Sequence, residues 1–260
     1  MKQLSEKQLE KVWSKQAETY QKFYDRSPDY LAYFGAIEQT VASGVGDLTD
    51  KKILDVGCGT AITSAYLAKK GAKLSLVDIS NIALGFAKKY FALKKLPAKF
   101  FCQSAFKMSF AKESFDVVWN GGVIEHFTDK NKIKIIKKMW QLVKPGGMML
   151  ISVPNAFDIP FMLAKQLLIL RGKWGFGEED NMSASRTKKL FFQAEINDCV
   201  QTFCYNPVVG WWFFPYGKEL TNWLGLNELN WHQRKCWFGH NVIAWAVKSS
   251  TKIASHKASS

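Results

Sequence analysis

The chain has 260 residues, enough for one large α/β domain or two small ones. Hydrophobic residues make up 47% of it and charged residues 22%, as in a globular protein with a full core. The five cysteines are odd in number and form no C-x-x-C pair, which excludes a disulfide framework and a zinc site. The N-terminus lacks the apolar core of a signal peptide, and no stretch approaches the ~18 apolar residues that span a bilayer. We therefore expect a cytoplasmic protein.

The net charge of +14 has two interpretations. A basic balance favours anionic partners such as nucleic acid, an acidic metabolite or a membrane surface. A solvated, lysine-rich surface without any anionic partner would give the same net charge. The lysines recur mostly at helical spacing rather than in one block, which favours the second interpretation.

Residues 1–50 are predicted to be helical. Trp13, Ala17, Tyr20 and Tyr24 recur at steps of three and four residues, which places an aromatic stripe on one helix face. We expect this segment to form an N-terminal helical lid.

From residue 51 short apolar segments alternate with amphipathic ones. Single helices between strands indicate crossover connections and a parallel sheet, and near-continuous apolar strands indicate a sheet covered on both faces. The expected strands are 53–56, 74–77, 99–102, 115–119 and 148–153, and the expected helices are 62–70, 82–93 and 130–143.

After Pro154 this alternation ends. The pattern predicts a helix over 157–170, a mobile glycine-rich loop over 171–185, a helix over 187–200 and two last strands over 202–214 and 242–248. The expected domain therefore covers 51–248, with an acceptor-pocket insertion at 155–240 after the fifth strand. Residues 249–260 are rich in Ser and Lys and predict a disordered tail.

The strongest chemical signal is the run from Asp55 to Ala61, which contains Gly57 and Gly59. Glycines at a strand-to-helix turn let the backbone approach a ligand, and sheets of this type bind ligands at the carboxyl ends of their strands. Asp78 ends the second strand nineteen residues after Gly59, where an acid accepts hydrogen bonds from ribose hydroxyls. A dinucleotide fingerprint would need a third glycine where Ile62 stands, so a dehydrogenase is disfavoured.

These motifs resemble the class I S-adenosylmethionine (SAM)-dependent methyltransferases, of the group that includes ubiquinone-pathway and small-metabolite enzymes. The resemblance covers residues 51–154 and rests on four segments in chain order. They are the glycine turn at 53–61, the acidic strand end at 77–80, the fourth strand with the Glu-His pair at 115–127, and the Pro-Gly-Gly turn at 142–147. It implies a Rossmann-like three-layer sandwich, with a mostly parallel seven-stranded sheet and helices on both faces.

The resemblance also implies roles for particular residues. Gly57, Cys58 and Gly59 would pack against the methionine part of SAM, and Asp55 would support its amino end. Asp78 would hold the ribose. The other implied cofactor contacts are Ile79 against adenine, Ser104 and Ala105 where the family often has Asp-Ala beside the adenine amino group, the backbone at Asn120 near the methionine amino group, and Tyr20 as a lid aromatic.

Methyl transfer requires an aligned acceptor and, where the acceptor carries a proton, a base. His126 is the leading candidate for that base, and Glu125 would orient it or act directly. The alternative is that both residues cap or pack the next helix. Some relatives carry a further acid three residues before the Glu and bind a divalent ion, but this chain has Gly122 there. We expect no metal site.

The acceptor is expected to be a small molecule methylated at oxygen or nitrogen, with S-adenosylhomocysteine as the second product. An anionic acceptor and an aromatic one both stay open. Aromatic side chains after the fifth strand either line an acceptor pocket or simply pack the core; they are Phe157, Phe161, Trp174, Phe176, Trp211, Trp212, Phe213, Phe214, Tyr216 and Trp223.

Three further alternatives remain. The net charge leaves open a nucleic-acid methyltransferase, although no Asn-Pro-Pro-Tyr or Asp-Pro-Pro-Tyr motif follows the fourth strand. A SAM-binding regulator without catalysis would show the same cofactor motifs. The apolar segment 157–170 also allows peripheral membrane contact.

Overall fold

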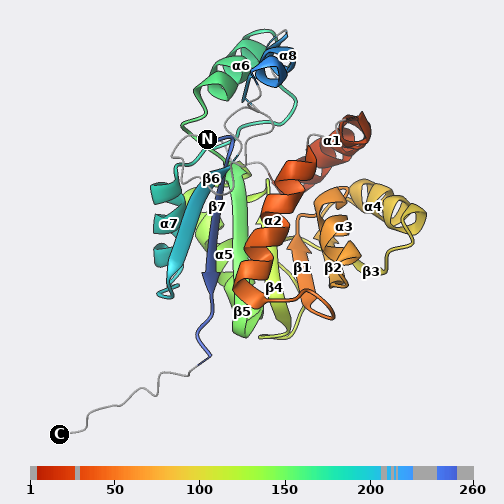
Figure 1. Ribbon diagram of the computed structural model, residues 1–260, viewed down its shortest axis with the longest axis vertical. Helices are drawn as coiled ribbons and strands as arrows, with labels where there is room; N and C mark the ends of the chain where they lie inside the picture. Colours follow the sequence, from red (N-terminus) through yellow and green to blue (C-terminus); the bar gives the residue numbers. More distant parts are fainter. Residues whose placement is uncertain are drawn as a thin grey trace, which may run out of the picture.

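A seven-stranded sheet forms the centre of the computed structural model, which describes residues 5–26, 30–205, 210–211, 214, 216–224 and 239–250 (Figure 1). The strand order is β3-β2-β1-β4-β5-β7-β6. β7 runs antiparallel to β5 and β6, and the other neighbours are parallel. The strands are β1 (Lys52–Val56), β2 (Lys73–Asp78), β3 (Ala98–Cys102), β4 (Phe115–Gly121), β5 (Val143–Pro154), β6 (Val200–Tyr205) and β7 (Asn241–Val247). The predicted mostly parallel sheet is confirmed.

Helices cover both faces of the sheet. In Figure 1, α2 crosses in front of the sheet and α5 lies behind it. The helices are α1 (Glu6–Arg26), α2 (Tyr30–Val45), α3 (Ile62–Lys69), α4 (Asn81–Leu93), α5 (Asp129–Leu142), α6 (Ile159–Leu170), α7 (Ala184–Gln193) and α8 (Gly217–Trp223), with a short 3₁₀ turn, η1 (Ile124–His126).

Two apolar cores separate these layers. Ile53 of β1 packs into one core with residues of α2, α3 and α4, whereas its neighbour Leu54 packs into the other with residues of α5 and α7. This alternation follows from the strand geometry, which sends successive side chains to opposite faces. Both faces of the strands are buried, so the strands are apolar almost throughout, and the chain forms the predicted α/β sandwich.

The two N-terminal helices have different positions. α2 packs on β5 and β4, and Tyr33 Oη donates a hydrogen bond to Ser152 Oγ at 3.0 Å. α1 packs against α4 and reaches the carboxyl ends of the strands, where Ser14 Oγ and Ser80 Oγ share a hydrogen bond of 2.8 Å. The predicted helical segment is confirmed, and α1 brings its residues to the ligand-binding edge of the sheet.

The region after β5 departs from prediction at two points. The helix expected over 187–200 is α7, which ends at Gln193, because Glu195 adopts a left-handed φ of 63° and Ile196 N donates to Phe191 O. This closing turn frees Val200 to begin β6. The strand expected over 202–214 ends at Tyr205, and residues 206–209, 212–213 and 215 lie outside the described part of the chain. So do Trp212, Phe213 and all but two residues of the tail expected over 249–260.

Candidate active site

A cavity of about 400 Å³ opens at the carboxyl ends of β1, β2, β4 and β5. Its walls come from α1, from the turns that follow these strands and from the segment after β5. Most residues predicted from the sequence to bind a cofactor line it, namely Asp55, Gly57, Cys58, Gly59, Asp78, Ile79, Ser104 and Ala105. Glu125 and His126 line the same cavity. The fold therefore brings the two predicted groups of residues together.

The floor of the cavity is the turn between β1 and α3. Gly57 and Gly59 have φ values of +74° and +53°, in the left-handed region that glycine adopts without steric cost. The amides of Gly57 and Cys58 both donate to Val77 O, at 2.8 and 2.9 Å, which fixes the turn against β2. A bound ligand can thus lie directly against the backbone here.

Substitution of Gly57 tests this turn. An added Cβ would overlap Val123 Cγ2, and the positive φ disfavours any side chain. We expect Gly57→Ala to destabilise the protein by ~1–3 kcal/mol and to weaken ligand binding at the turn. Thermal unfolding and calorimetry measure the two effects. Gly85→Ala in α4 is the control, because its Cβ would meet nothing within 4 Å, and it should not destabilise the protein.

Asp78 is held rigidly at the end of β2. Its two carboxylate oxygens accept hydrogen bonds from the amides of Gly59 and Ser80, both at 2.8 Å. Burial raises the pKa of this carboxyl above its ordinary value, while these amide donors lower it. Asp78 therefore links the glycine turn to the end of β2 and still borders the cavity.

Asp55 is a buried acid that also lines the cavity. Its side chain accepts a hydrogen bond of 2.7 Å from Ser64 Oγ, and Ser64 Oγ in turn accepts one of 3.2 Å from Trp119 Nε1. Burial, with a smaller contribution from the charge of Asp78, raises the pKa of Asp55 to about 8, although the Ser64 hydrogen bond acts to lower it. A cationic group of a ligand would favour the ionised carboxylate at this position.

Two predicted cofactor residues, Asn120 and Tyr20, are not among the described side chains that line the cavity. Asn120 points into the sheet, where its Nδ2 donates to Val56 O at 2.7 Å, and the cavity wall is formed by Gly121 and Gly122 instead. Its buried Oδ1 has no partner in the described structure. Tyr20 belongs to α1, but its side chain lies outside the described residues, whereas Trp13 and Ala17 of the same helix line the cavity.

Glu6 is a site residue that the sequence did not reveal. It lines the cavity from the first turn of α1, and Ser104 Oγ donates a hydrogen bond to its Oε1 at 2.7 Å. Its other oxygen lies 3.5 Å from Lys107 Nζ. A carboxylate thus stands beside Ser104, at the position where the motif itself lacks an acid. The two residues are 98 positions apart, so no local pattern could indicate their contact.

Glu125 is the most deeply buried acid at the far end of the cavity. It lies on η1, after the glycine pair that ends β4, and only 2% of its surface is exposed. Its Oε2 has no hydrogen-bond partner in the described structure. Burial, together with the nearby charge of Glu179, raises the pKa of Glu125 to about 8. Such a group matches the pKa that a general base needs near neutral pH.

His126 is held beside it. Its Nδ1 lies 3.3 Å from Glu178 O, and its ring meets that of Trp13 edge to face at a centroid distance of 4.8 Å. Burial lowers the pKa of His126 to about 4 against the backbone hydrogen bond. The imidazole is therefore neutral at physiological pH and is a weaker base than the Glu125 carboxylate.

Aromatic side chains surround this end of the cavity. Phe161 of α6 meets Trp174 edge to face at 6.1 Å, and Trp174 meets Phe176 at 5.0 Å. Lys165 lies behind them, with its Nζ 5.1 Å from the centre of the Trp174 ring and 3.0 Å from Glu179 Oε2. The sequence left open whether the aromatic residues after the fifth strand line a pocket or pack the core. Phe161, Trp174 and Phe176 line the cavity.

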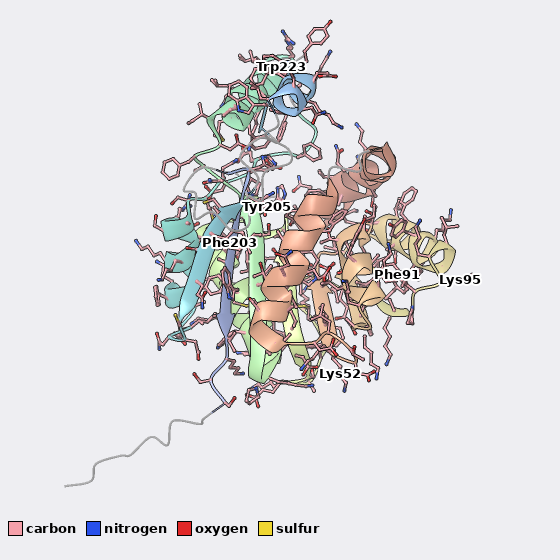
Figure 2. The ribbon with its side chains drawn as sticks, viewed as in Figure 1. Lys52, Phe91, Lys95, Phe203, Tyr205 and Trp223 are labelled. Carbon is pink, nitrogen blue, oxygen red and sulfur yellow. The ribbon has the colours of Figure 1, made fainter. Side chains whose placement is uncertain are left out.

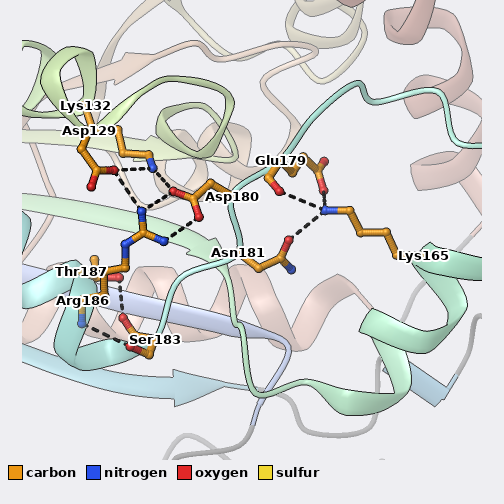
Figure 3. Close-up of polar contacts among 9 residues, drawn as sticks. All are labelled: Asp129, Lys132, Lys165, Glu179, Asp180, Asn181, Ser183, Arg186 and Thr187. Carbon is orange, nitrogen blue, oxygen red and sulfur yellow. Dashed lines mark hydrogen bonds and ion pairs between the residues drawn. The ribbon is translucent and has the colours of Figure 1, made fainter. Parts of the chain in front are cut away.

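The segment 174–183 forms this wall and is tied down along its length (Figure 3). Lys165 Nζ donates to Asn181 Oδ1 at 2.8 Å, and Asp180 pairs with both Lys132 and Arg186. The amide of Asp180 also donates to Glu125 O at 2.9 Å. The loop over 171–185 was expected to be mobile. Buried charged side chains anchor it instead, and it lies next to Glu125.

The electrostatic character of the cavity is opposite to that of the whole chain. Among the described residues that line it, no lysine or arginine occurs, whereas five acids do: Glu6, Asp55, Asp78, Glu125 and Glu179. The net charge of +14 therefore resides elsewhere. The described lining therefore offers no lysine or arginine to pair with an anionic ligand, and it favours a neutral or cationic one.

Within the described residues, no group of three or more His, Cys, Asp or Glu side chains is placed to hold a metal ion. His240 also lines the cavity, but its Nδ1 lies 2.7 Å from Asp158 Oδ2 and is committed to that pair.

Comparison with known proteins gives three kinds of similarity. Residues 53–147 match the model of a family described as a methyltransferase domain. The chain is 32% identical over 114 residues to the ubiquinone biosynthesis O-methyltransferase of Parvibaculum lavamentivorans, covering 44% of each chain. It is 30% identical over 161 residues to the enzyme of the same name from Pasteurella multocida, covering 58% of this chain and 62% of that one. The chain thus matches about half the length of these relatives.

The fold similarity is broader. The magnesium protoporphyrin IX methyltransferase of Synechocystis, solved with bound S-adenosylhomocysteine, superposes with a TM-score of 0.57 over 84% of both chains at 17% identity. At this identity the similarity concerns the fold. The family model, the curated relatives and the fold agree with the motifs at the glycine turn and the end of β2. The match over residues 53–147 and the shared fold therefore agree with the resemblance to methyltransferases that the motifs show.

Proposed function

We propose that this chain binds SAM at the β1–α3 turn and transfers its methyl group to oxygen or nitrogen of a small, uncharged or cationic, partly aromatic acceptor. The observation that carries the proposal is the cavity that joins the glycine turn and Asp78 to Glu125 and the aromatic wall. The names of the relatives support oxygen as the methylated atom.

The residues present fit SAM by their chemistry. The left-handed Gly57 leaves room for a ligand at the backbone, and Asp55 is a buried acid whose ionised form needs a positive group nearby. Asp78 would accept from the ribose, Cys58 and Gly59 would contact the methionine part, and Ile79 and Ala105 would border the adenine. When bound, SAM supplies a methyl group on a sulfonium that is already activated for transfer.

Glu6 is proposed to complete the adenine end. With Ser104 in place of an acid, the Glu6 carboxylate is the acceptor that the exocyclic amine of adenine would meet. α1 would then act as the lid of the 1–50 segment, since it closes the cavity with Glu6, Leu9 and Trp13. The segment after β5 would form the acceptor end, with Phe161, Trp174 and Phe176 as its apolar wall.

Glu125 is proposed as the base, with His126 in a positioning role. The unpartnered Oε2 of Glu125 can accept the proton of a hydroxyl or ammonium group of the acceptor. His126 is neutral and anchored to Glu178 O, so it fixes the wall beside Glu125. The buried position of both residues excludes water from the reacting groups.

The state of Asp55 makes SAM binding depend on pH. In the ligand-free protein Asp55 is protonated below about pH 8, and a cationic ligand requires its ionised form. Binding at pH 7 should release up to one proton, and affinity should rise up to about tenfold per pH unit between pH 6 and 7.5. Calorimetry in buffers of different ionisation enthalpy measures the proton count. Asp55→Asn should remove the pH slope and weaken binding; an unchanged slope would contradict this role.

The methyl-transfer proposal is tested with labelled SAM and a metabolite extract separated by ion exchange into anionic, neutral and cationic fractions. Label should appear in a neutral or cationic product, and excess S-adenosylhomocysteine should suppress it. Label confined to anionic products or to tRNA would overturn the acceptor assignment. Nucleic-acid binding that falls steeply with salt would favour the nucleic-acid alternative.

A further inference from the structure

Helix α6 presents an apolar face that no described residue covers. Its outward side chains Ile159, Leu163, Leu167 and Leu170 are spaced at i, i+4, i+8 and i+11, which places them on one face. Between 44% and 81% of each of these side chains is exposed. The opposite face carries Phe161, Ala164 and Lys165, which are buried. α6 thus has apolar side chains on both sides, and the described residues cover only one of them. A helix that is apolar all round belongs in an apolar environment.

Two basic residues lie at the C-terminal border of this face. Gln166 is the only polar residue that α6 exposes, since its one charged side chain, Lys165, is buried. α6 is followed by Arg171, Gly172 and Lys173, which are all exposed. An exposed apolar face with basic residues at its border is typical of helices that lie in the headgroup region of anionic membranes.

Further exposed aromatic and apolar residues lie at the same end of the molecule. Figure 1 shows α6 and α8 together beyond the carboxyl ends of the strands, and Figure 2 labels Trp223 there. Trp223 is 81% exposed, and Leu220 and Leu224 beside it are about half exposed, at 47% and 51%. Gly210, next to the half-exposed Trp211, lies against Asp158 at the start of α6. Trp and Tyr favour the boundary between lipid and water.

The length of α6 defines the mode of contact. Twelve residues correspond to ~18 Å of helix, which is too short to cross a bilayer. Among the described helices, none has the length and apolar content of a membrane span. A helix of this kind can only lie in the plane of the surface, with its outer face among the acyl chains.

We propose that α6, together with Arg171 and Lys173, is a docking surface for anionic lipid bilayers. The inner face of the same helix carries Phe161, which lines the cavity. Docking would therefore place the acceptor end of the cavity next to the lipid, where apolar compounds dissolve. A bilayer fits better than a second copy of this chain, because two copies would bring the basic ends of α6 and a net charge of +14 on each against one another.

The test is co-sedimentation of the full chain with vesicles of phosphatidylcholine and phosphatidylglycerol at 3:1, and with phosphatidylcholine alone. The chain should bind the mixed vesicles and bind the neutral ones more weakly. Leu167→Glu with Leu170→Glu should weaken binding about tenfold or more, because two apolar side chains no longer enter the lipid. Leu93→Glu is the matched control, since Leu93 is 76% exposed at the end of α4, and it should bind within about twofold of wild type.

Three outcomes would overturn the proposal. They are wild-type protein that does not bind the mixed vesicles, a double variant that binds them like wild type, and a Leu93→Glu variant that loses binding equally. Sedimentation velocity without lipid tests whether a second copy of this chain covers the face instead. A wild-type protein that is dimeric, with a double variant that is monomeric, would assign the face to a second copy. The vesicle test requires no methyl transfer, so it stands or fails independently of the proposed function.

Discussion

Replacing Glu125 with Gln is expected to lower the rate of methyl transfer by about 10²–10⁴-fold and to leave SAM affinity within a few-fold of wild type. The amide keeps the shape of the side chain but cannot take a proton from the acceptor. Single-turnover kinetics with labelled SAM, beside calorimetry of SAM binding, separates the two effects. Glu113→Gln, an acid-to-amide change at an exposed site paired with Lys248, is the control.

The pH profile distinguishes Glu125 from His126. Because burial raises the pKa of Glu125 to about 8, most of the wild-type protein holds it protonated at pH 7, and the rate should rise with pH up to about 8. His126, with its pKa lowered to about 4, is already neutral over that range and contributes no rise. Glu125→Gln should flatten the profile, and His126→Gln should lower the rate while keeping the rise. A rise that survives in Glu125→Gln and disappears in His126→Gln would reverse the two assignments.

Removing Asp180 should destabilise the fold by about 3–5 kcal/mol. Lys132 is fully buried, and its amine pairs with Asp180 and with the half-exposed Asp129. Arg186 donates two further hydrogen bonds to Asp180, at 2.6 and 2.7 Å. Asp180→Ala leaves a buried ammonium with one partial partner, which costs far more than the loss of an exposed ion pair.

Urea unfolding of matched variants measures this effect. Asp50→Asn removes the exposed pair with Lys73, keeps a residue type that tolerates the left-handed φ of 62° at this position, and should cost at most about 1 kcal/mol. Lys132→Met combined with Asp180→Asn should recover much of the loss, because no unpaired charge stays buried. A cost for Asp180→Ala no larger than that of the exposed control would show that the cluster does not anchor the 174–183 wall.

The features that the sequence predicts well are those encoded locally. The strands alternate with helices of the expected lengths, and the glycines at 57 and 59 adopt the left-handed conformation that their position implies. Asp78 meets this turn because parallel strands end at one edge of the sheet, which a strand pattern alone predicts. Position along the strand was therefore sufficient to bring Asp78 and the glycine turn together at one end of the cavity.

The contacts that could not be predicted join distant parts of the chain, at both ends of the cavity. Glu6 meets Ser104 across 98 residues, and Asp180 meets Lys132 across 48. The glycines and polar residues of the 171–185 loop indicate mobility, but buried partners that lie elsewhere hold it in place. The end of α7 depends on a left-handed Glu195, a residue type with no preference for that conformation.

The total charge is a similar case. A net charge of +14 suggested anionic partners, yet the described lining of the cavity contains acids and no lysine or arginine. The sum over a sequence reports on the surface as a whole, whereas recognition depends on the few residues that the fold brings to one place. The basic residues are relevant instead at the border of α6.

The central claim is that the turn at Gly57 and Gly59, with Asp55 and Asp78, binds SAM. Calorimetry of the purified chain with SAM, repeated with Asp78→Ala, tests it most directly. We predict one site per chain, competition by S-adenosylhomocysteine and a large loss of affinity in the variant. A wild-type chain that gives no binding heat and no competition, or a variant that binds as tightly as wild type, would contradict it.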